Sequence, residues 1–466
     1  MLMLGGLRAA GYTNMILSAL NFGASLFLAN YYLSHGAFLF LGNQFYIDAL
    51  NLLLIVLTTF VIFTTAIFSN TYMWHNVTSG KILPKRLRLY HIMYQLFALT
   101  MLIALMANNL GLLWVAMEGA TLATVFLVSL YRTKEAIEAA WKYFILCIVG
   151  IALALFGTVL IYFAASQLEV TIKLGIFWTE LHKYAANLDP KIIKIAFVFL
   201  LIGYGTKIGL VPLHNWLPDA HSESPAPMST LLSGLLLNVA LYALVRFKIL
   251  VDATLNNNFA GNMMIVFGLL SFFVAVIFMQ RQQNIKRLFS YSSIEHMGLM
   301  TFAFGLNNPL ANFCALFYML MHSLTKTAIF VTVGNVIQVT GTQTLDKMRG
   351  LINSRAFLGW SLLIATLIIA GIPPFGIFTS ELLLVLACYQ TLPILAIILA
   401  IGLVLALAGL LKHIQPVVYG EKTKISESPV CMFPAVFHLG LVLVFGLYLP
   451  GVVQKILQQA VIIIQK

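Results

Sequence analysis

The sequence predicts an all-α polytopic membrane protein with about thirteen transmembrane helices, two of them broken. Hydrophobic residues make up 61% of the 466 residues and charged residues only 9%, whereas an ordinary soluble domain has about 25% charged residues. The apolar runs reach about twenty residues, the length of a helix that crosses a bilayer. These observations exclude a secreted enzyme, a disordered chain and a single-span receptor, and they argue against an outer-membrane β-barrel.

The predicted spans follow one another with short loops between them. They cover residues 13–33, 49–69, 91–107, 110–130, 143–165, 193–220, 229–250, 261–280, 290–306, 310–337, 357–387, 392–411 and 433–449. We expect the first span to be retained, because no small-residue cleavage site follows it. The longest connecting stretches, 166–192 and 412–432, are too short for a soluble domain. An ATP-driven pump would therefore need an ATPase from a partner.

Basic residues in the loops predict the orientation and account for the net charge of +12 without nucleic acid. Seventeen lie on the side of the N-terminus, namely Arg8, Lys81, Lys85, Arg86, Arg88, Arg132, Lys134, Lys142, Arg281, Lys286, Arg287, Lys347, Arg349, Arg355, Lys412, Lys422 and Lys424. Eight lie on the other side, namely Lys173, Lys183, Lys191, Lys194, Arg246, Lys248, Lys455 and Lys466. Because cytoplasmic loops carry the excess of Lys and Arg, we expect the N-terminus in the cytoplasm and the C-terminus outside.

Four charged residues bear the cost of a charge near the bilayer centre, about 2.5–3.5 kcal/mol each on insertion scales. They are Glu118, Lys207, Lys326 and Glu381. Such side chains must face the protein interior or water. One interpretation is buried ion pairs that lock helices together, although such pairs stabilise weakly. The other is a proton or ion path, which is the usual role of ionisable groups inside a membrane.

Two of the charged spans contain helix breakers. The run GTKIGLVPLHNWLPDAH at 205–221 contains Pro212, and the run AGIPPFGIFTSE at 370–381 contains Pro373 and Pro374. Proline removes a helical hydrogen bond and clashes with the preceding turn. Broken helices occur in a bilayer where the freed backbone lines a cavity, and in transporters they mark ion sites. A plain kink is the alternative for either break.

A stripe of titratable residues follows one face of the span 310–337. Tyr318, His322 and Lys326 are spaced at i, i+4 and i+8, which places them on one helix face. Histidine titrates near neutral pH, so the stripe favours a proton relay. A histidine that only packs and hydrogen-bonds is the alternative.

Further candidates lie close to the breaks and in the next spans. His214 follows the first break, and Glu295 with His296 lies in 290–306; both sites could be near a cavity mouth or a loop. His221, Asp219 and Glu223 are predicted at the cytoplasmic end of the first broken span. They could form an inlet funnel or be solvated loop residues.

Several stretches together resemble one known family. They are VAMEGATLATVFLVSLY (115–131), EAAWKYFILCIVGIALALFGT (138–158), GTKIGLVPLHNWLPDAHSESPAP (205–227), IKRLFSYSSIEHMGL (285–299), HSLTKTAIF (322–330) and GIPPFGIFTSE (371–381). The chain resembles the antiporter-like proton-translocating membrane subunits of complex I and of group 4 membrane-bound hydrogenases, closest to the component F proteins of hydrogenase-4. The resemblance extends from about residue 50 to the end.

The resemblance implies two antiporter-like inverted repeats and a chain of alternating charges at mid-membrane. Residues 1–90 would be N-terminal helices with the first family helix missing, 91–250 the first repeat, 261–415 the second, and 416–466 a C-terminal helix and tail. Glu118 matches the glutamate that pairs with a broken-helix lysine, and Lys207 matches that lysine. Lys326 matches the central lysine of the second half, and Glu381 the terminal charged position.

The chain departs from the family at one charged position and in length. Asn238 stands where respiratory relatives usually carry a bridging lysine or histidine, and an amide cannot carry a proton by changing its charge. His214, His322 or water must then bridge Lys207 to Lys326, or the path is interrupted. The long lateral helix of the distal member in complex I is also absent.

The implied function is a membrane subunit of a redox-driven pump that translocates protons, or Na⁺, in a complex of hydrogenase-4 or formate hydrogenlyase type. The four cysteines lack metal-binding spacing, so we expect no cofactor in this chain and iron–sulfur and nickel–iron centres in partner subunits. Expected partners are other membrane subunits, a cytoplasmic redox arm and lipid, in the inner membrane of a bacterial or archaeal cell. The alternatives are a cation/proton antiporter, a subunit of an inorganic-carbon uptake complex, or an inactive scaffold.

Overall fold

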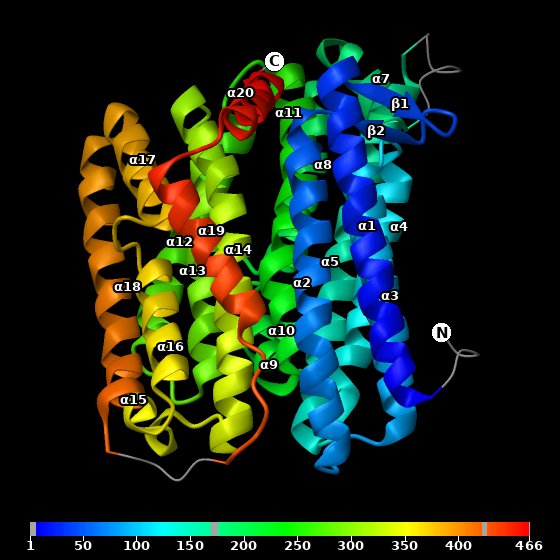
Figure 1. The fold of residues 1–466 in the computed structure, drawn as a ribbon. Helices are drawn as coiled ribbons and strands as arrows, with labels where there is room; N and C mark the ends of the chain where they lie inside the picture. The colour runs from blue at the N-terminus through cyan, green and yellow to red at the C-terminus, as the bar shows by residue number, and fades with distance from the viewer. Residues whose placement is uncertain (1–5, 169–175, 422–425, 466) are drawn as a thin grey trace.

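The computed structural model describes residues 6–168, 176–421 and 426–465, which form a bundle of long helices (Figure 1). The N-terminal helices lie on one side of the bundle and the C-terminal helices on the other, with the central part of the chain between them. We term the end that carries the short hairpin Phe38–Ile47 the hairpin end, and the opposite end, where the first helix begins, the basic end. The topology-marking residues Lys173, Lys422, Lys424 and Lys466 lie outside the described residues.

The N-terminal side contains the helices up to the first break. They are α1 (Leu7–His35), α2 (Ala49–Thr78), α3 (Pro84–Met106), α4 (Leu110–Val128), α5 (Lys134–Ser166), α7 (Trp178–Lys183) and α8 (Pro190–Ile208), with strands β1 (Phe38–Phe40) and β2 (Phe45–Ile47) and short 3₁₀ turns η1 (Ser129–Tyr131) and η2 (Ala185–Asn187). Side chains before several helices cap them: Asp48 accepts from the first amides of α2, Asn109 from those of α4 and Thr133 from α5. These caps explain why the helices start where they do.

The rest of the bundle is built from the helices after the break. They are α9 (Trp216–Glu223), α10 (Ala226–Leu231), the π-helical turn η3 (Leu232–Leu236), α11 (Leu237–Leu255), α12 (Phe259–Met279), α13 (Ile285–Gly305), α14 (Pro309–Thr340), η4 (Leu345–Lys347), α15 (Leu351–Ser354), α16 (Ala356–Ile369), α17 (Gly376–Thr391), α18 (Pro393–Tyr419), α19 (Phe433–Leu447) and α20 (Gly451–Gln465). The prediction of an all-α membrane protein is confirmed.

A helix or helix pair occupies each of the thirteen predicted ranges. Among the described residues, however, only nine helices are long and apolar enough to cross a membrane, or up to eleven if each bent pair is one span. Three of the others fall short for identifiable reasons: α8 carries three lysines, α13 carries polar and charged residues along its length, and α17 has only 16 residues. The count of thirteen crossings therefore stays a prediction.

The continuous helical stretch Ala226–Leu255 and helix α14 form the centre of the bundle. In the apolar part of each, 100% of the residues are buried. The outer helices instead expose large apolar side chains, such as Phe27 at 73% and Ile394 at 75% exposure. In a bilayer these side chains face lipid, whereas polar groups on the central helices can only meet other protein groups or internal water.

Both predicted breaks are confirmed. Helix α8 ends at Gly209, which has φ +83°, and the chain passes Pro212 before α9 begins. The second break follows α16, where Gly371 has φ +70° and Pro373 and Pro374 precede α17. Only glycine adopts this left-handed conformation without strain. Each break frees backbone groups inside the bundle.

Residues Gly451–Gln465, in the stretch expected to be a C-terminal tail, form the helix α20. It is bent by 75° relative to α19 and lies across the hairpin end (Figure 1). Its buried side chains, including Ile456, Leu457 and Ala460, are spaced at helical intervals. The helix is amphipathic, so its apolar face covers the bundle while polar residues such as Lys455 point outward.

Three basic residues that the loop count took as topology markers lie inside the bundle. Arg246 is 4% exposed, Lys248 0% and Lys286 1%. Each is bound to oxygen atoms of the protein: Arg246 to Asp48, Lys248 to Asp252, and Lys286 to backbone carbonyls. Their charges are satisfied internally, so they carry no information about the orientation.

Candidate functional site

Lys207 lies in the last turn of α8, directly before the first break, and its side chain is fully buried. Its Nζ donates a hydrogen bond to Thr121 Oγ1 of α4 and lies 5.5 Å from the centre of the Tyr143 ring. The break is fixed by Trp216, whose Nε1 donates to Thr206 O at 2.8 Å and whose ring lies 4.7 Å from Tyr143. The break in the helix thus places the buried ammonium of Lys207 at the end of α8.

Glu118 lies on α4 three residues before Thr121 and is only half-buried. Thr121 Oγ1 accepts from Lys207, and its one proton can go to Met117 O at 3.2 Å or to Glu118 Oε2 at 3.5 Å. Among the described residues, Lys207 and Glu118 form no direct ion pair. The two groups that the sequence suggests as a pair are therefore joined through the hydroxyl of Thr121.

Lys326 lies in the middle of α14 and is also fully buried. Its Nζ donates to Phe289 O and to Ser292 Oγ, both of α13 and both at 2.9 Å. These acceptors are neutral, and no ion pair to Lys326 exists among the described residues. A charged ammonium held only by neutral groups inside a membrane protein is unfavourable as a structural element.

Three buried histidines surround the middle of α14. His322 lies one turn from Lys326, and its ring centre is 5.6 Å from that of His296 on α13. His221 of α9 stacks on Phe330 of α14 at 4.9 Å. Within the described part of the chain, neither ring nitrogen of His322 or His221 has a hydrogen-bond partner. Buried polar atoms are normally satisfied by protein or ordered water, so these four ring nitrogens are unusual for side chains that only pack.

A hydrogen-bonded chain connects α13, α14 and α17. His296 Nδ1 lies 2.6 Å from the Tyr318 hydroxyl, which donates to Glu381 Oε1 at 3.0 Å. His296 Nε2 lies 4.0 Å from Glu295 Oε2, and both side chains are buried. The sequence placed Tyr318 on a stripe with Lys326 but could not show that its hydroxyl joins a histidine on one helix to a carboxylate on another.

The second break makes room for Glu381. A Cβ atom at Gly371 would meet Glu381 Oε2, and the φ of +70° favours glycine at this position. The break with Pro373 and Pro374 therefore brings backbone against Glu381 of α17. Glu381 is 7% exposed.

Asn238 lies near the start of α11, just after the π-helical turn. Its Nδ2 donates to Met319 O at 2.9 Å and to Ser323 Oγ at 2.8 Å, both on α14. Its Oδ1 is buried and has no partner within the described residues. The amide thus ties the two central helices together and leaves one acceptor for water.

The remaining predicted residues are dispersed. His214 is 7% exposed, its ring centre lies 6.3 Å from that of Tyr291, and no hydrogen bond among the described residues joins it to Lys207. Glu223 is half-buried at the basic end and accepts from Ser222 Oγ. Asp219 pairs with Arg287 and Lys142 in an ion network near the surface. His221 is buried, so it is not a solvated loop residue.

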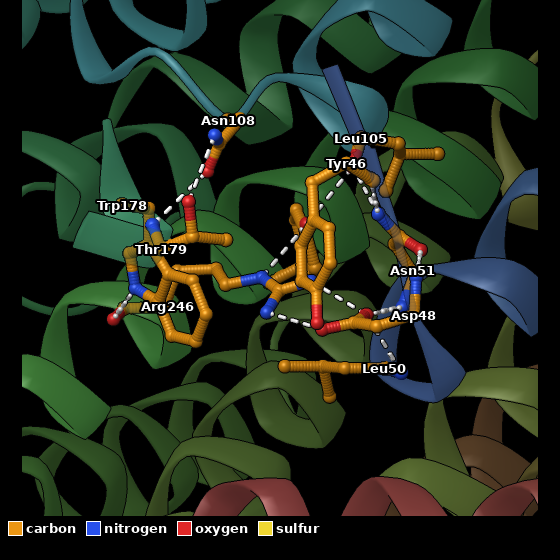
Figure 2. Close-up of polar contacts among 10 residues, drawn as sticks. Tyr46, Asp48, Leu50, Asn51, Leu105, Asn108, Trp178, Thr179 and Arg246 are labelled. Carbon is orange, nitrogen blue, oxygen red and sulfur yellow. Dashed lines mark hydrogen bonds and ion pairs between the residues drawn. The ribbon is translucent and has the colours of Figure 1, made fainter. Parts of the chain in front are cut away.

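Three buried cations, Lys248 among them, were missed as internal groups. Lys286 donates to Ser224 O at 2.6 Å and to Ser222 O at 3.4 Å, and thereby holds the end of α9. Arg246 forms two bonds of 2.7 Å with Asp48 and lies 4.6 Å from the Trp178 ring (Figure 2). The only signal in the sequence is the position of Arg246 and Lys248 within the apolar span 229–250.

Comparisons with known proteins agree with this architecture. Residues 107–406 match the family described as NADH:quinone oxidoreductase/Mrp antiporter, transmembrane. The chain is 47% identical to a hydrogenase-4 component F homolog of Methylacidiphilum infernorum over 445 residues, 95% of this chain and 92% of that protein. It is 29% identical to a Na⁺/H⁺ antiporter subunit of Alkalihalophilus pseudofirmus over 77% of this chain and 72% of that protein.

Among solved structures, the chain is similar in fold to a chain of the membrane-bound sulfane sulfur reductase, an archaeal respiratory membrane complex. The TM-score is 0.85 at 23% identity, over 98% of this chain and 92% of that chain. The resemblance stated from the sequence motifs is confirmed.

Proposed function

The chain belongs to the NADH:quinone oxidoreductase/Mrp antiporter membrane family, and from this premise we propose that it is the ion-translocating membrane subunit of a redox-driven pump of the hydrogenase-4 type. The ion is the proton. The polar groups at mid-membrane, Glu118, Lys207, Lys326, His322 and Glu381, form its path.

The observation that carries this proposal is the His296–Tyr318–Glu381 chain beside the buried Lys326. A hydroxyl between an imidazole and a carboxylate can pass a proton in one step. Tyr318 gives its own proton to Glu381 and takes one from His296 Nδ1. The tyrosine stays neutral, the imidazole loses one proton and the carboxylate gains one. The distances of 2.6 and 3.0 Å are those of hydrogen bonds, as this transfer requires.

The Lys207 region supports a separate role as a charge switch. The ammonium and the Glu118 carboxylate communicate through Thr121, so a small movement of α4 or of the break changes how strongly the charges interact. Because α8 ends at this lysine, the break is a natural hinge. Protonation of Lys207 then depends on the position of α4.

We further propose the setting of this subunit. The N-terminus and the basic end face the cytoplasm, in the inner membrane of a bacterial or archaeal cell, as the excess of loop Lys and Arg favours. Protons enter near His221 and Glu223 and reach Lys326. The redox reaction, with its iron–sulfur and nickel–iron centres, belongs to partner subunits of a cytoplasmic arm, and other membrane subunits and lipid cover the exposed apolar helices.

A second candidate function is Na⁺/H⁺ exchange, supported by the similarity to the Na⁺/H⁺ antiporter protein of Alkalihalophilus pseudofirmus. The two functions differ in their ion requirement. A redox-driven proton pump acidifies vesicles without Na⁺, whereas an exchanger needs Na⁺ and no electron donor.

The variant Tyr318→Phe tests the proposed function. It removes the bridging hydroxyl and keeps the ring, so we expect redox-driven proton translocation in membrane vesicles to fall on the order of 100-fold. Tyr94→Phe is the matched control, because Tyr94 is equally buried and its hydroxyl donates only to Ile62 O. Unchanged translocation by Tyr318→Phe in an assembled complex would contradict the proposed relay.

A further inference from the structure

Two cation–carboxylate pairs lie close together on α11 at the hairpin end, and they differ in their access to solvent. Arg246 pairs with Asp48, and the side chains are 5% and 1% exposed. Lys248, two residues later, pairs with Asp252 on the next turn, and these side chains are 0% and 18% exposed. Both side chains of the Arg246–Asp48 pair are buried, and we call it the sealed pair. In the Lys248–Asp252 pair the ammonium is buried and the carboxylate is partly exposed, and we call it the open pair.

The sealed pair is covered by aromatic rings. Arg246 lies against Trp178 and Tyr242 at 4.6 and 5.1 Å, and its Nε donates to the Tyr242 hydroxyl at 2.9 Å. Asp48 also caps α2 by accepting from the amides of Leu50 and Asn51. Figure 2 shows the guanidinium between the indole and the carboxylate. Because a guanidinium stays protonated in proteins, this pair joins α11 to α2 and transfers no proton.

The open pair has the groups that a proton transfer needs. Lys248 Nζ donates to Asp252 Oδ2 and to Asn307 Oδ1, the latter at 2.9 Å. Asp252 Oδ1 is buried and has no partner within the described residues. A lysine, unlike an arginine, can release its proton when it is buried. Both partners of the ammonium, Asp252 and Asn307, lie nearer the solvent, and of the two only the carboxylate can take up its proton.

A polar cavity of about 540 Å³ adjoins this carboxylate at the hairpin end. Its walls include Asp252, Asn256, Asn257, Asn258 and Asn307, and the end of α20 closes one side with Ile464 and Gln465. The cavity is large and polar enough to hold water. Asp252 is thus placed between a buried base and an aqueous compartment.

We propose that Lys248 and Asp252 form the outlet through which a proton leaves the bundle into this cavity. The proposal rests on the proposed function, since it needs a proton supplied from mid-membrane. In the transfer, the Lys248 ammonium gives one proton to the Asp252 carboxylate, and the neutral acid gives it to water in the cavity. The neutral amine then takes the next proton from the interior, so the pair returns to its starting state.

Polar atoms on the two central helices mark a route from mid-membrane to this pair. Asn238 and Lys248 are ten residues apart on buried α11, about 15 Å along the axis. On α14, Asn312 lies three turns from Ser323 on the same helix face, and Ser323 contacts Asn238. Asn312 is fully buried, and neither atom of its amide has a partner within the described residues. Asn238 Oδ1 and the Asn312 amide thus provide buried polar atoms at these two levels.

The variant Lys248→Arg separates an outlet from a structural tie. Arginine keeps the positive charge and the donors to Asp252 and Asn307 but cannot release a proton. For an outlet, we expect redox-driven proton translocation by the complex in membrane vesicles to fall about tenfold or more, with normal assembly. Asp252→Asn, at a partly exposed position that tolerates substitution, should give the same loss. Lys455→Arg, exposed on α20 at the same end, is the matched control and should behave as wild type.

Three outcomes decide the proposal. Loss of translocation in both Lys248→Arg and Asp252→Asn, with Lys455→Arg intact, supports the outlet. Wild-type translocation in either assembled variant overturns it and leaves the pair a structural tie. Lys326→Met, measured in parallel, separates failure of the outlet from failure of the proposed function. If Lys326→Met stops translocation and Lys248→Arg does not, the outlet fails and the proposed function stands. If Lys326→Met has no effect, the proposed function fails.

Discussion

The two buried lysines, Lys207 and Lys326, occupy different kinds of site. Lys207 ends a broken helix and shares Thr121 with a half-buried carboxylate, so its neighbourhood contains one acid and a hinge. Lys326 lies mid-helix, is held by a carbonyl and a serine, and has buried histidines and a Tyr–Glu bridge nearby. The difference indicates a division of labour between the two lysines. The protonation of Lys207 responds to helix movement, whereas Lys326 supplies protons to the relay.

The largest effect is expected from Lys326→Met. Methionine has a similar volume, and replacing a buried charge by an apolar side chain is often neutral or stabilising, so the chain should fold and assemble. Proton translocation should fall on the order of 100-fold because the relay loses its donor. Lys455→Met on the exposed face of α20 is the control. Dye-monitored acidification of vesicles is the measurement, and retained acidification would show that Lys326 is structural.

A smaller effect, about tenfold, is expected from Gly371→Ala. The new methyl group would meet the Glu381 carboxylate, and a non-glycine residue at φ +70° costs about 1–2 kcal/mol. Gly341→Ala is a close control, since Gly341 has φ +72° and nothing lies within 4 Å of its added Cβ. Thermal melting should show a similar backbone cost for both, whereas only Gly371→Ala should lose translocation. An equal loss in the two variants would point to backbone strain alone.

Thr121→Val tests the Lys207 side of the comparison. It removes the hydroxyl between Lys207 and Glu118, and an unmade buried hydrogen bond costs about 1–3 kcal/mol. We expect a loss of translocation of about fivefold, with Thr124→Val for comparison. Thr124 binds Tyr143, which lies over Lys207, so that both variants report on this site. Thr158→Val is the independent control, since Thr158 is also buried and donates to Ala154 O within its own helix. If Thr121→Val matched Lys326→Met in severity, the two lysines would belong to one site and the division of labour would be wrong.

The smallest effect on translocation, below about twofold, is expected from Asn238→Ala. Asn238 bridges α11 to α14, and interhelical hydrogen bonds in membranes average about 0.6 kcal/mol. The loss of two should lower the melting temperature of the complex measurably. Asn335→Ala, which removes contacts from α14 to the Cys431 backbone, is the comparison variant. A severe loss of translocation would instead show that the route to Lys248 depends on the Asn238 side chain itself.

Much of the fold was predictable because its signals are local. Apolar runs of fixed length mark the helices, and Gly209, Pro212 and Gly371 mark the two breaks. The hairpin and α20 were not predicted, because short strands and an amphipathic terminal helix have weak hydropathy signals. The number of crossings stays a prediction, since polar residues in α8 and α13 make these helices ambiguous by hydropathy.

The candidate site was predictable in its residues and only partly in its connections. Charges inside apolar runs identify Lys207 and Lys326 without any structure. Contacts between distant segments cannot be read in this way: Asp48 and Arg246 are 198 residues apart, and Tyr318 and Glu381 are 63 apart. The placement of Thr121 between Lys207 and Glu118 depends on the crossing of α4 and α8, which hydropathy does not encode.

The most direct test of the account is proton translocation by the complex with Glu381→Gln. Glutamine keeps the size of the side chain and can accept the hydrogen bond from Tyr318, but its amide cannot take up a proton. The account predicts an assembled complex that translocates protons at less than about a tenth of the wild-type rate. Translocation at the wild-type rate would contradict it, because no proton could then pass from His296 through Tyr318 to position 381.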